Sequence, residues 1–536
     1  MTGNKILLSL SFLFLVVASY AQDNSVHQNA SFQPYDRFLY NSDNRFHTSV
    51  KPYDMTEVSK IVSIDTLYII HTRECKDKYI SHLLNNDWVR YRSEDFNFNI
   101  NPAFNFELSQ HSDDTTNRIG WINDRGVFIN GNITDKVYFY TAFHEIQSNF
   151  TDYRRDRIKE LGHGTIPGIS RGKRFGENGG LDYAYAEGFV SYIPSKYFGF
   201  QLGHGKNFIG DGYRSLILSD NAQNYPYFKV TTNVWNLKYV MMWSQQYYLE
   251  NNHQGNTRYE KKWNVMHYLD WSVTKWLNVA FFETINWGND TLGTNRGFEF
   301  NYINPCIFLR PVEFSIGSPD NCLMGLTGKL TLWKNHVFYG QAILDEFKFD
   351  EFKKHSGWWG SKYGLQAGYK TFDIAKIKGL DFQTEVNYVR PFIYSHFTYS
   401  QNYAHAGQPL AHPRGANFYE SVSFLRYNWK RFFFEAKYEY LVYGRDTANS
   451  NYGGDIFKLY QTRTQEYDNK IGKGGDQNII TYTDLTASYM INPKSNMNIS
   501  LGVSHRKQRS EHADTQDQWM YFIGFRTSLN NFYYDF

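Results

Sequence analysis

Three segments of the sequence carry the side chains best suited to chemistry. They span residues 205–222, 304–321 and 409–418, and they mix Arg, Asp, Asn and Ser with Tyr and Phe. Planar polar groups can bind sugar hydroxyls, aromatic faces can stack on pyranose rings, and Arg can pair with acidic sugars. This composition favours carbohydrate recognition. The alternative is internal: the segments fold inward and their polar groups satisfy one another.

Enzyme motifs are weak. The sequence contains no G-x-S-x-G and no H-E-x-x-H. The run Gly210-Asp211-Gly212 has no strand–turn–helix context, so it does not predict a dinucleotide site. His163 and His412 are possible bases, but no sequence partner can be nominated for either. We therefore expect no catalytic residue, no cofactor and no metal site.

From Phe96 onward, polar and apolar residues alternate with the period of a β-strand. The clearest runs are residues 363–370, 380–388, 432–440 and 497–504. In a membrane barrel the apolar face of such a strand meets lipid, and the polar face lines the lumen. This arrangement also explains how a chain that is 18% aromatic has a mean hydropathy of only −0.57.

Short turns alternate with long connections along the same region. Short turns are expected near residues 134, 195, 235, 275, 335, 376, 430 and 493. Long loops are expected at residues 151–180, 206–225, 251–262, 289–320, 350–358, 391–416, 444–478 and 506–517. This asymmetry predicts an all-β, transmembrane antiparallel barrel of about 18 strands over residues 96–536, with short turns in the periplasm.

The two ends of the chain support a bacterial outer-membrane location at the cell surface. Residues 1–21 have a charged start, an apolar run and small residues before Gln22, which predicts a signal peptide. Residues 22–95 are expected to form a periplasmic N-terminal segment with a short helix within 74–88, where apolar residues have helical spacing. The aromatic stretch 521–536 ends at Phe536, and we expect it to be the last strand, read by the barrel insertion machinery.

Charge and cysteine content exclude some partners. A net charge of +3 over 536 residues argues against nucleic acid. The three cysteines give neither a disulfide framework nor a metal-ligand spacing. Cys306 and Cys322 flank one predicted loop, and whether they pair is left open.

The strings at residues 205–222, 304–321 and 409–427 resemble the Wzi-type capsule-assembly barrels, above all their Bacteroidetes branch, the RemB-type gliding-motility proteins. The resemblance covers nearly the whole mature chain. It implies an eighteen-stranded outer-membrane barrel with periplasmic helices near the N-terminus. It further implies a surface protein that holds capsular or extracellular polysaccharide, or that serves gliding motility.

The predicted strand order sends the long loops to one rim, where we expect an extracellular patch that binds polysaccharide. Its residues are Lys206, Asp211, Tyr213, Arg214, Asn221, Arg414 and Asn417. Structural roles are expected for Arg310 and Glu313, which would tie a folded-in loop to the lumen wall, and for Phe536.

The sequence is compatible with three functions. The first is a non-catalytic surface barrel that binds polysaccharide or an adhesin, or that works with motility proteins. The second is a diffusion pore for small solutes or oligosaccharides. The third is an outer-membrane hydrolase. The expected partners are outer-membrane lipid, surface polysaccharide and the insertion machinery.

Overall fold

The computed structural model describes residues 35–62, 76–112, 119–169, 171–176, 179–249, 259–291, 294–527 and 533–536. The predicted signal peptide and Cys75 lie outside these residues. No helix within the described ranges is both long enough and apolar enough to cross a membrane.

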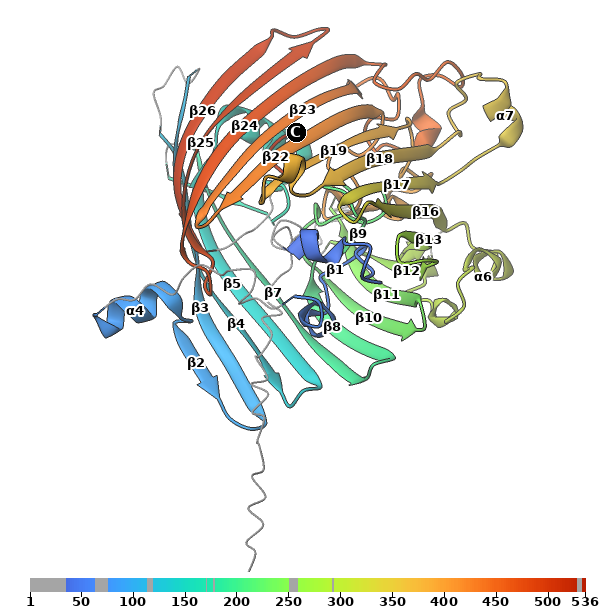
Figure 1. The fold of residues 1–536 in the computed structure, drawn as a ribbon. Coiled ribbons are helices and arrows are strands. Elements are labelled where there is room, and N and C mark those ends of the chain that lie inside the picture. Colours follow the sequence, from blue (N-terminus) through green and yellow to red (C-terminus); the bar gives the residue numbers. More distant parts are fainter. Residues whose placement is uncertain are drawn as a thin grey trace, which may run out of the picture.

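Eighteen antiparallel strands close into one barrel (Figure 1). In wall order they are β3 (Phe96–His111), β4 (Gly120–Ile133), β5 (Val137–Asn149), β7 (Gly180–Ser195), β8 (Phe198–Gly205), β10 (Tyr225–Val234), β11 (Leu237–Tyr248), β12 (Glu260–Ser272), β13 (Leu277–Gly288), β16 (Asn321–Leu332), β17 (His336–Leu344), β18 (Tyr363–Thr371), β19 (Leu380–Val389), β22 (Phe418–Trp429), β23 (Phe432–Arg445), β24 (Asp476–Asn492), β25 (Met497–Ser510) and β26 (Gln516–Arg526). The pairing of β26 with β3 closes the wall. The predicted fold class is confirmed.

Smaller elements decorate the barrel. The short strands are β1 (Val50–Lys51), β2 (Val89–Arg92), β6 (Lys173–Phe175), β9 (Phe208–Ile209), β14 (Asp290–Thr291), β15 (Thr294–Asn295), β20 (Ala404–His405) and β21 (Gln408–Pro409). The helices are α2 (Met55–Ser59), α4 (Lys78–Asn85), α5 (Asp152–Leu161), α6 (Arg310–Ser315) and α7 (Phe349–Lys353). Single 3-10 turns are η2 (Phe300–Ile303), η3 (Ile374–Lys376), η4 (Tyr399–Gln401) and η5 (Tyr460–Thr462).

The wall is apolar outside and polar inside, as the alternation predicts. On β19, Glu385 is 1% exposed, whereas its neighbour Val386 is 50% exposed. On β25, Ser500 is buried and Leu501 is exposed. A closed barrel with an apolar outer belt satisfies every wall hydrogen bond without water and is the architecture of bacterial outer-membrane proteins. The chain is therefore an outer-membrane β-barrel.

Turn lengths at the two ends of the barrel differ as expected. Only Lys430 and Arg431 separate β22 from β23, whereas residues 446–475 separate β23 from β24 at the other end. The short-turn end faces the periplasm and the long-loop end faces outside. One predicted loop, 506–517, is wrong in extent, because β25 continues to Ser510 and β26 starts at Gln516. Polar residues there lie on the strands and pair across them, as Lys507 does with Asp517 at 2.7 Å.

The last strand also differs from the prediction. β26 ends at Arg526, so Phe536 is not part of the closing strand. Thr527 is the last residue bonded to β3: its amide donates to the Phe104 carbonyl at 2.8 Å, and its hydroxyl donates to the Pro102 carbonyl at 2.8 Å and accepts from the Phe104 amide at 2.7 Å. Residues 533–536 lie inside the lumen, where Phe536 is 6% exposed. These aromatic residues are buried against protein rather than lipid.

Residues 35–62 occupy the lumen at the short-turn end. Lys238 of the wall pairs with Glu57 at 2.8 Å, and Lys329 donates to the Thr48 hydroxyl at 2.9 Å. The helix expected within 74–88 is α4. It lies beside the barrel (Figure 1), where Asn492 donates to the Leu83 carbonyl at 2.7 Å.

Candidate functional site

The lumen holds a protein-like core built by two inward-folded segments, residues 206–224 and 390–417. Leu216, Ile217 and Leu218 are at most 2% exposed and pack against lumen-facing wall residues. The Tyr394 hydroxyl donates to the Leu216 carbonyl at 2.7 Å. The Ser219 amide donates to the Leu410 carbonyl at 2.8 Å. Together with residues 35–62 and 533–536, we call these segments the lumen plug.

Arg214 is the electrostatic centre of the plug. Its side chain is 1% exposed and lies 2.9 Å from Glu420, 3.0 Å from Asp535 and 3.6 Å from Glu439. Glu420 and Glu439 come from the wall, whereas Asp535 comes from the plug. Lys437 also pairs with Asp535. A buried charge needs such pairing to be tolerated, so this cluster fixes the plug to the wall.

Every residue of the predicted patch has an internal partner. Asp211 accepts from the Tyr40 and Thr48 hydroxyls. The remaining contacts are Lys206 to the Asp220 carbonyl, Tyr213 to Asp535, Asn221 to the Pro409 carbonyl, Arg414 to Glu160, and Asn417 to the Lys473 carbonyl.

The two predicted loops therefore meet, but inside the barrel. Lys206, Asp211, Arg214, Asn221 and Asn417 are all at most 6% exposed. The expected extracellular patch is wrong in its placement, because apolar residues between these polar groups draw the segments into the lumen. The structure instead has the alternative arrangement, in which the segments fold inward and their polar groups bond to other groups of the chain.

The Arg310–Glu313 segment is also placed differently from the prediction. The pair exists, with 2.7 Å between Arg310 Nη1 and Glu313 Oε2, but Arg310 is 60% exposed. Its loop packs on the outer face of the wall, not in the lumen, since Leu309 clusters with Val265 and Ile285, which alternate with lumen-facing residues.

Cys322 is buried beside this loop and Cys306 is exposed, and both are free thiols. Among the described residues, no group of three or more His, Cys, Asp or Glu side chains could hold a metal ion.

Helix α5 covers the lumen at the long-loop end. Its buried residues Tyr153, Arg154, Arg157 and Ile158 follow a helical stripe that faces inward. Arg157 donates to the Pro413 carbonyl at 3.0 Å, which ties the helix to the plug. Burial alone would raise the pKa of Glu160, but Arg157 and Arg414 outweigh it and hold that pKa below its ordinary value.

A basic strip follows α5 at the same end. Arg171, Lys173 and Arg174 are exposed, and β6 holds the last two against β7. Arg171 lies 5.1 Å from the centre of the Tyr259 ring and donates to the His163 carbonyl at 2.8 Å. We call these three residues the rim strip. Sequence reasoning missed it, although three bases in four positions of a predicted long loop were a visible signal.

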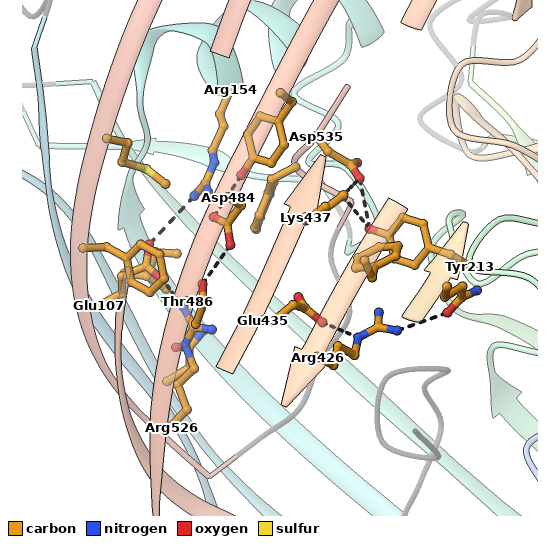
Figure 2. Close-up of a pocket in the computed structure, with 18 of the residues that line it drawn as sticks. Glu107, Arg154, Tyr213, Arg426, Glu435, Lys437, Asp484, Thr486, Arg526 and Asp535 are labelled. Carbon is orange, nitrogen blue, oxygen red and sulfur yellow. Dashed lines mark hydrogen bonds and ion pairs between the residues drawn. The ribbon is translucent and has the colours of Figure 1, made fainter. Parts of the chain in front are cut away.

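A cavity of about 300 Å³ remains in the lumen beside the plug (Figure 2). Its ionisable lining is five basic and five acidic residues. Opposite charges pair across it, as Arg426 does with Glu435 at 2.6 Å and Arg526 with Glu107 (Figure 2). A balanced lining gives no surplus of one sign to select a charged ligand. The rim strip, not this cavity, is the stronger candidate site.

No family model matches the sequence, and neither does any characterised protein. The fold, in contrast, matches solved outer-membrane proteins. One is Wzi of Escherichia coli, described as an outer-membrane protein involved in group 1 capsule assembly and a carbohydrate-binding β-barrel, with 14% identity, 94% of this chain and 99% of that chain covered, and a TM-score of 0.54. Pseudomonas aeruginosa OprD matches at 10% identity over 81% of this chain and 96% of that one, with a TM-score of 0.41. The chain therefore shares its fold with the Wzi barrel.

Proposed function

We propose that this chain is a non-catalytic outer-membrane barrel that holds an acidic surface polysaccharide at its long-loop end. The observation that carries the proposal is the rim strip, an exposed basic run on the outward end of a barrel whose lumen is packed with its own chain. The fold shared with a carbohydrate-binding barrel supports it.

The chemistry of the rim strip fits such a ligand. Arg171 and Arg174 can each form paired hydrogen bonds with a uronate carboxylate. Phe175, which is 41% exposed, and Tyr259 offer apolar faces beside them. Pairing of β6 with β7 fixes the backbone of Lys173 and Arg174, so little backbone ordering is needed there on binding. Two of the residues first predicted to bind polysaccharide contact the chain just before the rim strip: Lys206 donates to the Gly168 carbonyl and Arg414 to Glu160.

The test is a triple variant, Arg171→Gln, Lys173→Gln and Arg174→Gln, expressed in the native host. We expect normal surface levels and a several-fold loss of retained polysaccharide. Its matched control is Lys196→Gln, Lys376→Gln and Lys378→Gln, which removes three exposed charges at the opposite end of the barrel. Equal retention in both variants would reject the rim strip.

Gliding speed measured in the same strains tests the motility role that the sequence resemblance implies. A gliding defect with normal polysaccharide retention would favour motility over polysaccharide holding.

The packed lumen disfavours the competing pore hypothesis. The plug core around Leu216 and the Arg214 cluster occupy the middle of the barrel. We expect the purified protein to give no steady open channel in a planar lipid bilayer. A stable ohmic conductance would favour the pore instead.

A further inference from the structure

Residues 296–320, which we call the outer-wall segment, pack against the outside of the barrel. Tyr302 and Leu309 are fully buried against the outward side chains Val265, Ile285 and Trp287. Val265 alternates on β12 with Asn264 and Met266, which face the lumen. Figure 1 shows α6 of this segment outside β12 and β13.

The outer-wall segment covers a carboxylate that would otherwise face lipid. Glu283 points outward from β13 yet is 1% exposed. It accepts three backbone N–H bonds, from Phe308 at 2.8 Å, Leu309 at 2.6 Å and Arg310 at 3.0 Å. A charged group on the lipid face is destabilising unless it is satisfied. The segment is therefore a fixed part of the wall.

A second set of bonds closes the base of the segment. Arg296 pairs with Asp320 at 2.8 Å, and the Tyr302 hydroxyl donates to Asp320 at 2.6 Å. The segment is thus held at both ends and in the middle, so the face it turns away from the wall has a defined composition.

That far face exposes four large apolar side chains, with the Arg310 side chain, 60% exposed, among them. Phe300 is 75% exposed, Phe308 63% and Phe314 86%, and Ile303 lies between them at 47%. It is continuous with the lipid belt of the barrel, because Met324 and Leu326 on the adjoining strand β16 are also exposed and outward. Exposed aromatic residues grouped in this way mark a surface that leaves water.

We propose that the outer-wall segment is a lipid anchor whose exposed phenylalanines insert among the acyl chains of the outer leaflet. The partner is lipid, because the face continues the lipid belt, lies on the membrane-facing side of the wall and belongs to the long-loop half of the barrel. The anchor is independent of what the rim strip binds.

The experiment measures the depth of one side chain. Phe314→Cys is made in a Cys75→Ser, Cys306→Ser background, labelled with a bimane fluorophore, and reconstituted in phosphatidylcholine vesicles with or without doxyl-labelled lipid. Leu326→Cys on the wall serves as the lipid-exposed reference, and Tyr467→Cys in the loop between β23 and β24 as the aqueous one; both parent side chains are exposed. Heat-dependent gel migration first establishes that each variant forms a closed barrel.

We expect doxyl lipid to quench the label at position 314 as strongly as at 326, within about twofold, and several-fold more than at 467. Quenching at 314 no stronger than at 467 would overturn the proposal and point to a protein partner for this face. If Phe314→Cys does not fold, Phe308→Cys replaces it under the same criterion.

A second readout comes from Cys322, which is buried in the cluster beneath the segment. Glu283→Ala removes the acceptor of the three N–H bonds, so we expect maleimide labelling of Cys322 to rise at least tenfold. Phe308→Ser with Phe314→Ser keeps that acceptor and should leave Cys322 protected. Equal protection in both variants would show that the wall does not hold the segment through Glu283.

Discussion

Replacing Arg214 with Ala should loosen the lumen plug more than removal of any other single charge in the plug, because Arg214 faces three buried carboxylates. The substitution leaves Glu420, Glu439 and Asp535 buried; Lys437 still lies beside Glu439 and Asp535, and the His412 imidazole beside Glu420. Breaking a buried charge pair by removing one partner costs about 3–5 kcal/mol. Each factor of ten in an equilibrium constant corresponds to about 1.4 kcal/mol. The equilibrium constant for docking of the plug should therefore fall about 100- to 4000-fold.

The assay is the temperature at which the compact band converts to the unfolded band on a gel run without prior boiling. Arg214→Ala should convert at a clearly lower temperature. Arg445→Ala is the matched control, because that side chain is 53% exposed and lies 4.0 Å from Glu160, where an ion pair contributes about 0–1 kcal/mol. Adding Glu420→Ala should recover part of the loss, since one unpaired carboxylate is then gone. A wild-type transition in Arg214→Ala would refute the role of the cluster.

Three further outcomes follow from the same contacts. Arg310→Ala should lower stability by less than about 1 kcal/mol, since the Arg310 side chain is 60% exposed in its pair with Glu313 and is long enough to reach the polar headgroups; a larger drop in the gel transition would contradict this. Because the folded pKa of Glu160 lies below its ordinary value of about 4.3, its contribution is present above that value and lost as pH falls further. Glu160→Gln should therefore flatten the acid side of the stability profile, and an unchanged profile would contradict the pairing of Glu160 with Arg157 and Arg414. Deleting residues 533–536 keeps all β26–β3 pairs, so we expect a closed barrel with a less stable plug, measured as surface level and gel transition; loss of the barrel would restore the idea that these residues direct closure.

The wall was predictable from sequence because its period-two alternation depends on local residues alone. Asp381, Gln383, Glu385 and Asn387 face the lumen and the residues between them face out, as the pattern of β19 required. Turn positions followed for the same reason. The closing strand was misjudged at its end, because aromatic residues such as Phe536 fit a lipid belt and a packed lumen equally well.

The candidate site was harder to predict, because contacts with residues distant in sequence decide whether a loop folds into the lumen, onto the outer wall or into solvent. The segment 205–222 was interpreted as a polar loop, yet the position of Arg214 and Leu216 within it is set by Glu420 and Gln341, more than 100 residues away. The outer-wall segment could not be placed for the same reason. Glu283 calls for a covering segment because its side chain points outward, and that direction is known only once the strands of the wall are known. The rim strip, in contrast, could have been identified from the sequence, because its three basic residues lie within four positions.

The central claim is that the rim strip holds an acidic polysaccharide, and equilibrium binding tests it most directly. The purified barrel in detergent would be titrated with polygalacturonate and with uncharged dextran of similar length, at low and high salt. We predict binding to polygalacturonate alone, weaker at high salt because charge pairs are screened, and at least tenfold weaker for the variant Arg171→Gln, Lys173→Gln, Arg174→Gln. Binding that is absent, indifferent to polymer charge, or unchanged in that variant would contradict the account.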